Sequence, residues 1–347
     1  MDARMLDKAD LATVLERLAQ TRRLIAPVED RTGAAFASVD EVAAIRLDYR
    51  NTSLSAKEIV FPQTEPLLVF RDGAAEERIP AAPGAVLFGV RPCDARSLTM
   101  LDAVFRGGET EDPYYAARRD ELTVVALTCN EPGPTCFCTS VGGSPDDGSG
   151  ADVLATDLDD GLLLRAITDR GEVLLGELDA GRPAEDGEIE AARDLAARAA
   201  ERMENVPVPT DAAALLATFD SDLWSDLAAG CIGCGACTYA CPTCHCFDIT
   251  DEQKRGTGHR VRSWDACTFP LFTLHGSGHN PRPTATARLR QRVLHKFSYC
   301  PENFGEAFCV GCGRCVVHCP SGIDIRRILA RLDAVLTANS EAGGPTR

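Results

Sequence analysis

The sequence lacks any long apolar segment. No part of its 347 residues approaches the roughly 20 consecutive apolar residues that a membrane-spanning helix needs. Its first residues, MDARMLDKADLATVL, carry acidic side chains where a secretory signal peptide has basic ones. These absences predict a cytoplasmic chain without a membrane span. Because thiols stay reduced in the cytoplasm, we expect closely spaced cysteines to be metal ligands or catalytic groups, not disulfides.

Positive charge is also scarce. The chain holds 36 Lys and Arg against 52 Asp and Glu, a formal net charge of −16. This balance argues against a nucleic-acid-binding protein, whose footprint is a basic face that releases counterions from phosphate. The one basic segment is residues 251–347, with 14 Lys and Arg against 8 Asp and Glu.

The common nucleotide and hydrolase motifs are missing. No G-x-G-x-x-G follows a predicted strand, and the chain has no P-loop, H-E-x-x-H or G-x-S-x-G. The sequence therefore predicts no flavin or nicotinamide bound by this chain alone, and no independent active site.

Cysteine, in contrast, is abundant, with 16 residues, and eight of them form two matching motifs. Both motifs read C-x2-C-x2-C-x3-C-P. In two-cluster ferredoxins the first three thiolates of such a motif bind one [4Fe-4S] cluster and the fourth binds the other cluster. The motifs therefore predict cluster 1 on Cys231, Cys234, Cys237 and Cys319, and cluster 2 on Cys309, Cys312, Cys315 and Cys241.

Structural zinc is the alternative for these eight cysteines, because zinc sites also use Cys-x2-Cys pairs. A zinc site takes four ligands from two such pairs, whereas each motif here has three evenly spaced thiols and a fourth before proline. The spacing favours clusters. The first cysteines of the two motifs lie 78 residues apart. This wide spacing resembles the α-helical ferredoxin domain of succinate dehydrogenase iron–sulfur subunits and heterodisulfide reductase subunits.

A second group of cysteines follows two predicted strands. The apolar runs 85–90 and 123–128 read as strands flanking a helix at 95–105, and each run ends beside a cysteine. In an α/β layer such strand ends lie at one edge of the sheet. Prolines in the loop after the second strand would bend it toward that edge. We therefore predict a third [4Fe-4S] cluster, with zinc or scattered buried thiols as alternatives, on Cys93, Cys129, Cys136 and Cys138.

Four cysteines and one arginine remain as weaker candidates. Cys244, Cys246, Cys267 and Cys300 are enough for a fourth site of four cysteines. Alternatively, Cys244 and Cys246 lie beside a cluster and tune its potential or act as redox partners. Arg314, inside the second motif, is the best candidate to offset the negative charge of a cluster, and its alternative is an exposed surface arginine.

The predicted fold is α+β with two domains. Residues 1–205 form an α/β domain with the third cluster site, the segment 206–210 (VPVPT) reads as a linker, and residues 206–347 form an α-helical ferredoxin (dicluster) domain. The predicted helices cover residues 6–18, 189–203, 211–227 and 323–336, and further hairpin strands cover 152–156, 162–167 and 172–175.

With these motifs in place, the chain resembles the iron–sulfur β subunit of soluble NAD(P)-linked [NiFe] hydrogenases (sulfhydrogenases), a family related to the iron–sulfur subunit of anaerobic sulfite reductase. The segments that carry the resemblance are FPQTEPLLVF (61–70), FGVRPCDARSL (88–98), CNEPGPTCFCTS (129–140), ACPTCHCFD (240–248), RSWDAC (262–267), HNPRP (279–283) and CVGCGRCVVHCP (309–320).

The resemblance implies an electron-transfer subunit of an oxidoreductase complex. Its partners would be an FAD/[2Fe-2S] subunit that exchanges hydride with NAD(P)H, and the small and large [NiFe] hydrogenase subunits or a sirohaem sulfite reductase subunit. The resemblance also supports the third cluster. Two other functions stay open: direct thiol or disulfide chemistry at Cys244 or Cys246, as in heterodisulfide reductases, and a zinc-stabilised interaction module.

Overall fold

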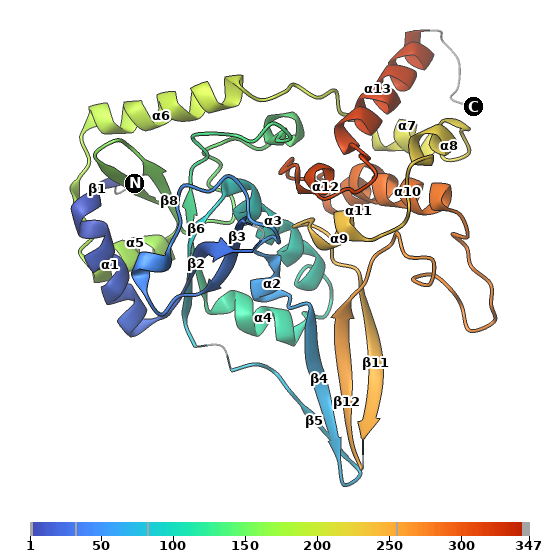
Figure 1. Ribbon diagram of the computed structural model, residues 1–347, viewed down its shortest axis with the longest axis horizontal. Helices are drawn as coiled ribbons and strands as arrows, with labels where there is room; N and C mark the ends of the chain where they lie inside the picture. Colours follow the sequence, from blue (N-terminus) through green and yellow to red (C-terminus); the bar gives the residue numbers. More distant parts are fainter. Residues whose placement is uncertain (1–2, 32, 82, 255, 342–347) are drawn as a thin grey trace.

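An eight-stranded mixed sheet forms the body of the N-terminal half (Figure 1). The computed structural model describes residues 3–31, 33–81, 83–254 and 256–341. Strands β2, β6, β7 and β8 run parallel, and the other pairs are antiparallel. In spatial order the strands are β10 (Arg182–Pro183), β1 (Ala3–Asp7), β9 (Gly161–Ala166), β8 (Val153–Asp157), β7 (Leu122–Leu127), β6 (Ala85–Val90), β2 (Arg23–Asp30) and β3 (Gly33–Ser38).

The central strands β6 and β7 are buried along their whole length because helices cover both faces of the sheet. One face packs against the apolar sides of α1 (Lys8–Thr21) and α5 (Asp169–Leu178). The other face packs against α2 (Lys57–Val60), α3 (Pro92–Phe105) and α4 (Pro113–Asp120). Continuous apolar runs, not alternating ones, are what such doubly covered strands require.

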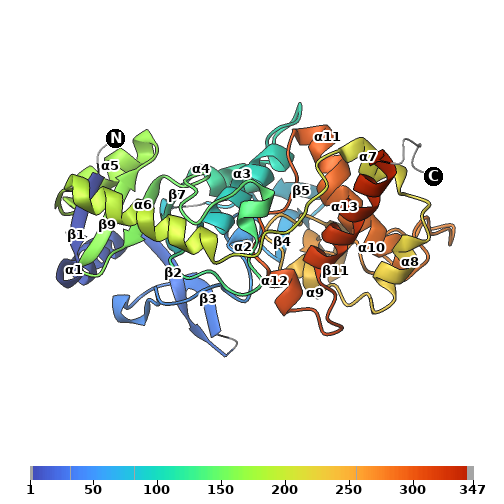
Figure 2. The same ribbon diagram turned by 90° about the horizontal axis from the view of Figure 1, so that it is seen from above.

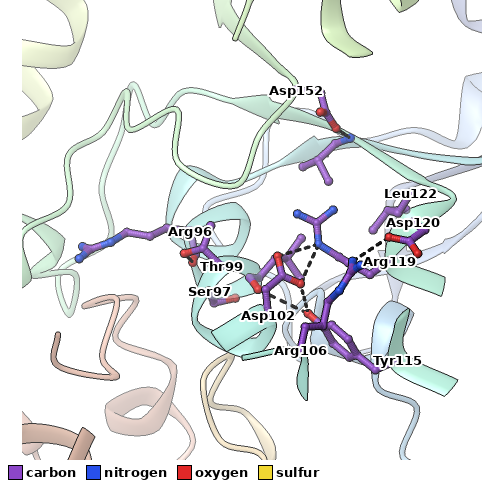
Figure 3. Close-up of polar contacts among 12 residues, drawn as sticks. Arg96, Ser97, Thr99, Asp102, Arg106, Tyr115, Arg119, Asp120, Leu122 and Asp152 are labelled. Carbon is purple, nitrogen blue, oxygen red and sulfur yellow. Dashed lines mark hydrogen bonds and ion pairs between the residues drawn. The ribbon is translucent and has the colours of Figure 1, made fainter. Parts of the chain in front are cut away.

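Helix α3 connects β6 to β7 and begins at a proline, whose fixed φ suits the first helical turn. Asp102 on α3 binds α4 through the Tyr115 hydroxyl at 2.8 Å and the Arg119 Nε at 3.2 Å (Figure 3). Arg106 bonds Asp120 at 2.7 Å in the same network. These contacts join α3 to α4, which packs on the same face of the sheet. They thereby help to position α3, and Cys93 lies in its first turn.

A second sheet projects from the body as an arm (Figure 1). It joins two hairpins that are far apart in the sequence, in the order β11 (Phe247–Lys254), β12 (Thr257–Trp264), β4 (Thr64–Arg71) and β5 (Ala74–Glu77). At its base the Trp264 Nε1 donates to the Phe61 carbonyl at 3.1 Å, and Arg262 forms an ion pair with Glu65 at 2.6 Å. The arm therefore crosses the predicted division at residues 205 and 206, and that boundary stays a prediction.

The C-terminal half is a group of short helices at the opposite end from β1 and β9 (Figure 2). Their shared core contains Leu215, Trp224, Leu289, Phe297 and Leu329. The helices are α7 (Ala212–Ala217), α8 (Leu223–Ala228), α9 (Ala236–Tyr239), α10 (Ala285–Leu294), α11 (Cys300–Phe304), α12 (Arg314–Val317) and α13 (Ile325–Glu341). The predicted α/β region followed by a helical region is confirmed.

Three local predictions were wrong. The strand predicted at 172–175 is part of α5, because Thr168 caps a helix there by accepting from the Gly171 N–H, and leucines at helical spacing face the sheet. The helix predicted at 211–227 breaks between α7 and α8. The helix predicted at 6–18 begins only at Lys8, because the residues before it form β1.

Other predicted elements shift by a few residues. The helix predicted at 189–203 is α6 (Asp186–Glu201), which begins earlier because Glu185 and Glu188 form a capping box. The helix predicted at 323–336 is α13, which continues to Glu341. No helix in the described ranges is long and apolar enough to cross a membrane.

Candidate metal centre

Set A consists of Cys231, Cys234, Cys237 and Cys319, and these four cysteines line one pocket. Cys231 and Cys234 lie on the loop between α8 and α9, where Gly233 and Gly235 have positive φ values of 67° and 77°, and Cys237 lies in the first turn of α9. Cys319 reaches the pocket from the second motif, just after α12. The Ile323 N–H donates to its Sγ at 3.1 Å. The exchange of the fourth cysteine predicted from the spacing is therefore present in the fold.

Set B consists of Cys241, Cys309, Cys312 and Cys315. The Cys241 thiol interacts electrostatically with each of the other three, so the fourth cysteine of the first motif faces the second motif. Burial raises the pKa of the Cys312 thiol to about 12. Without metal this thiol is neutral near pH 7, and metal binding there must release its proton.

Set C consists of Cys93, Cys129, Cys136 and Cys138, which line another pocket together with Met203. Cys93 lies in the first turn of α3 after β6, and Cys129 follows β7, so both stand at the carboxyl ends of neighbouring parallel strands. The loop after β7 brings the other two cysteines to the same place. Burial raises the pKa of Cys138 to about 12.

The loops of set B and set C are in direct backbone contact. The Phe137 N–H donates to the Gly311 carbonyl at 2.8 Å, and the Asn51 side chain donates to the Cys312 carbonyl at 2.8 Å. A Cβ on Gly311 would lie 2.4 Å from the Cys138 nitrogen, a distance that real Cβ atoms do not adopt. Cys93 also lies close enough to Cys312 for their charges to interact. The two sets are therefore neighbours.

Sets A and B meet at Arg292 of α10. Its guanidinium donates to the Cys237 carbonyl at 3.0 Å and to the Cys244 Sγ at 3.2 Å. Arg292 and Cys315 of set B also line the pocket of set A. Set B therefore touches both other sets.

Three buried cations lie around set B, and no ion pair with a carboxylate is formed by any of them within the described part of the chain. Lys296 donates to the Cys241 Sγ at 3.3 Å and to the Phe308 carbonyl at 2.8 Å. Lys57 donates to the Cys244 carbonyl at 2.9 Å. With Arg292 they form what we call the cation group. Since a buried charge is stable only with a counter-charge, the group fits an anion held by set B.

The pKa values of the cation group reflect these surroundings. Burial alone lowers the pKa of Lys296, but the thiols of Cys241 and Cys244 outweigh burial and raise it. For Lys57 burial prevails and lowers the pKa to about 8. The Cys244 thiol, followed by the positive charges of Lys296 and Arg292, holds the pKa of Cys241 well below its usual range. Cys241 is therefore the set B cysteine that most readily becomes a thiolate.

Arg314 is not the exposed residue of the alternative prediction, because only 1% of its surface is accessible. It is paired with the buried Asp94 carboxylate through two 2.6 Å bonds and donates to the Thr52 carbonyl at 2.9 Å. Arg314 lies near Cys312 and Cys93. Asp94 already balances the charge of Arg314. The cation group is therefore the better candidate for the predicted role of offsetting cluster charge.

The other four cysteines lie outside the three sets. Cys244 contacts Cys241 and Arg292. Cys246 and Cys267 lie close together at the base of the arm, where each thiol influences the pKa of the other. Cys300 is buried in an apolar cluster with Met100 and Phe308. No fourth set of four cysteines is formed in the described ranges.

Zinc, the alternative for these cysteines, has a geometric requirement of its own. A tetrahedral zinc site with Zn–S bonds of about 2.3 Å needs its sulfurs within roughly 3.8 Å of one another. In the part of the chain that is described, no three Cys, His, Asp or Glu side chains converge in a way that could hold a single metal ion.

The three sets contain the twelve cysteines that the sequence singled out, but Lys57 and Asn51 were not predicted. Both lie on the segment before β4, which carries no motif, and both act on residues nearly 200 or more positions away in the sequence. Arg292 and Lys296 were visible only as part of the basic surplus of residues 251–347. Arg292 and Lys296 are four positions apart and so share one helical face. This spacing is the sequence pattern that could have indicated them.

The chain is similar to known iron–sulfur proteins. The family model of the 4Fe-4S dicluster domain matches residues 230–323. Sulfhydrogenase 2 subunit beta of Pyrococcus furiosus is 31% identical over 316 residues, which cover 90% of this chain and 93% of that protein. No solved structure matches the chain. The match to the dicluster domain confirms the two [4Fe-4S] clusters predicted from the motifs.

Proposed function

Because the chain belongs to the family of sulfhydrogenase beta subunits, we propose that it is the electron-transfer subunit of a cytoplasmic NAD(P)-linked [NiFe] hydrogenase complex. It passes electrons between a flavoprotein subunit, which exchanges hydride with NAD(P)H, and the subunits that hold the [NiFe] site. The chain itself performs no substrate chemistry in this proposal.

Sets A and B hold the two clusters of the dicluster domain, and set C holds a third [4Fe-4S] cluster. Bound clusters supply one-electron carriers whose potential depends on hydrogen bonds to sulfur, on burial and on nearby charge. The protein's part is to deprotonate the thiols, to exclude water and to place positive charge. The cation group provides that charge beside set B, and the Ile323 N–H provides a hydrogen bond to sulfur in set A.

The observation that carries this proposal is that set B touches both other sets. Arg292 and Cys315 join it to set A, and the contact of Gly311 with the Phe137–Cys138 loop joins it to set C. Electron transfer through the chain requires a continuous row of sites such as this one. A zinc-stabilised interaction module does not require its sites to be neighbours. Cys234 of set A is exposed, so this end of the row is open to a partner protein.

The decisive variant is Cys312→Ala, which removes the set B cysteine that also lines the pocket of set C. We expect the loss of one cluster and of electron transfer between flavin and the catalytic subunits, while each partner keeps its own half-reaction with artificial carriers. Cys300→Ala is the matched control, since Cys300 is also buried but belongs to no set. Full NAD(P)-linked turnover in the Cys312 variant would overturn the conduit.

Metal analysis of the anaerobically purified complex tests the partners and the cluster number. Three [4Fe-4S] clusters require about 12 iron and 12 acid-labile sulfide per chain. Nickel in a co-purifying subunit supports the hydrogenase complex, and sirohaem in its place would indicate a sulfite reductase. Colourless protein with stoichiometric zinc would exclude both.

A further inference from the structure

Cys246 and Cys267 form a pair outside the three sets. Cys246 directly precedes β11 and Cys267 shortly follows β12, so the two cysteines stand at the open end of one hairpin, at the base of the arm. The Asp265 N–H donates to the Cys246 carbonyl at 3.0 Å and holds the two chains together there. The two thiols lie close enough to shift each other's pKa, which is lowered for Cys246 and raised well above its usual range for Cys267.

A positive charge lies beside this pair. Lys57 stacks over the Trp264 ring at 3.9 Å and is held by the Cys244 carbonyl at 2.9 Å. Its ammonium is close enough to interact with Cys246. A positive charge next to a thiol favours the thiolate, which is the form that attacks a disulfide or is oxidised.

The pair differs from an inert buried thiol in the same protein. Cys300 is 1% exposed, lies among apolar side chains and has no thiol partner in the described ranges. Cys267 is also buried, at 9% exposure, but its partner Cys246 is partly exposed. Cys246 therefore gives protons a route to solvent, which a redox-active thiol needs and a packing residue does not.

We propose that Cys246 and Cys267 are a redox-active dithiol that exchanges two electrons with the neighbouring iron–sulfur clusters. The inference rests on the proposed function, since it needs those clusters as the electron acceptors. Cys244 links the pair to set B, because its sulfur lies beside Cys241 while its charge interacts with Cys246.

The chemistry balances within the chain. Oxidation breaks two S–H bonds, forms one S–S bond between Cys246 and Cys267, releases two protons to solvent and delivers two electrons. Two clusters in the oxidised state each accept one of these electrons. The reverse reaction uses two reduced clusters and two protons. The pair thereby stores two electrons in a protein whose other carriers take one at a time.

The test is a redox titration of the anaerobically purified holoprotein. Samples poised at a series of potentials are quenched with acid, alkylated with iodoacetamide, digested and analysed by mass spectrometry. We expect a peptide cross-link between Cys246 and Cys267 at high potential and full alkylation of both at low potential. Reductive titration with dithionite should consume two electrons fewer in Cys246→Ser than in the wild type.

Cys300→Ser is the matched control and should leave the electron count unchanged. The proposal is overturned if Cys246 is alkylated equally at every potential, or if Cys246→Ser loses iron, which would make Cys246 a cluster ligand. Iron and sulfide are measured on the same samples. Wild-type protein without clusters would overturn the proposed function, whereas intact clusters with no cross-link would overturn only the dithiol.

Discussion

At the scale of single residues, the cation group is the feature that the cysteine motifs leave unexplained. A buried charge without a counter-charge costs several kcal/mol. Lys57, Arg292 and Lys296 are all buried, and their partners are carbonyls, a hydroxyl and sulfur. The negative charge of a cluster with four thiolates supplies what they lack. The group therefore links the binding of clusters to the stability of the fold.

Replacing Lys296 with Met should make the reduction potential of the set B cluster more negative. The ammonium hydrogen bond to the Cys241 sulfur stabilises the more negative, reduced state. A hydrogen bond to a charged group is worth about 1.5 kcal/mol or more, and this energy corresponds to roughly 60 mV for one electron. A redox titration followed by electron paramagnetic resonance measures the shift. Lys8→Met, at a surface ion pair with Asp157, is the control and should change nothing.

Acid should destabilise the protein through His245. Burial lowers its pKa from about 6.5 to about 4, and the nearby charges of Lys296 and Lys57 act in the same direction. Between these two pH values the unfolded chain binds a proton at His245 and the folded chain does not. This contribution to stability is therefore complete above pH 6.5 and is lost as the pH falls toward 4. The loss approaches about 3 kcal/mol.

The test is the thermal midpoint of the holoprotein at pH 7 and pH 4.5. His245 packs edge-on against Phe105 and Phe308, so His245→Phe keeps an aromatic ring in place. That variant should show a smaller drop between the two pH values than the wild type. His295, next to His245, has a pKa lowered to about 4 by burial and contributes its own share. An unchanged pH dependence in His245→Phe would rule out this origin.

Local spacing was enough to predict the cysteines but not the residues that surround them. A cluster motif is a local pattern, because three of its four cysteines lie within seven residues of each other. Lys57 acts through two carbonyls supplied by the first motif and its continuation, at Thr238 and Cys244. Only the folded chain brings such residues together, so no sequence pattern marks them.

At the scale of elements, the loops of set B and set C are packed so closely that an added side-chain atom would clash. Gly313 has φ 73°, and a Cβ there would lie 2.3 Å from the Thr135 Oγ1 and 2.5 Å from the Thr135 carbonyl oxygen. Glycine is needed both for the backbone conformation and for the close approach. The two loops therefore constrain each other.

Gly313→Ala should reduce the iron content of both set B and set C, since the added methyl group must push the Thr135 loop away. The matched control is Gly305→Ala, where φ is 81° but no atom lies within 4 Å of the new Cβ. The control has the same backbone strain, about 1–2 kcal/mol, and should keep its iron. Equal iron in both variants would show that the close approach is unimportant.

The prediction of helices and strands from sequence succeeded where the hydrophobic pattern of a segment was unambiguous. The buried strands β6 and β7 were predicted because both faces are covered and the runs are wholly apolar. The arm was missed because β11 and β12 carry many charged and polar residues, so neither strand forms an apolar run. The α5 segment was predicted as a strand because its leucines alone resemble a short apolar run. The capping Thr168 was the opposing signal.

At the scale of the whole molecule, the two halves are joined by a buried ion pair. Asp94 on α3 is 0% exposed and Arg314 on α12 is 1% exposed, and they form two bonds of 2.6 Å. Arg314 also donates to Thr52. The fold class and the two clusters of the dicluster domain could be predicted from sequence. The ion pair could not, because no sequence pattern indicates that Asp94 and Arg314 lie together.

Arg314→Met should destabilise the protein by about 3–5 kcal/mol, because it leaves a buried carboxylate without a counter-charge. The double variant Asp94→Leu with Arg314→Met removes both charges and should recover a large part of this loss. Thermal unfolding of the holoprotein measures both variants. If the double variant is less stable than Arg314→Met alone, the unpaired Asp94 charge is not the cause.

The crossing of the arm between the two halves has a consequence for biosynthesis. Strand β4 pairs with β5 at once, but its other edge waits for β12, which the ribosome adds roughly 190 residues later, or about 10–40 s at usual rates of synthesis. An unpaired strand edge in a nascent chain is a template for wrong pairing. The last cysteines of sets A and B emerge later still, whereas all four of set C precede β12. If iron is delivered during translation, it therefore reaches set C first and the dicluster domain last.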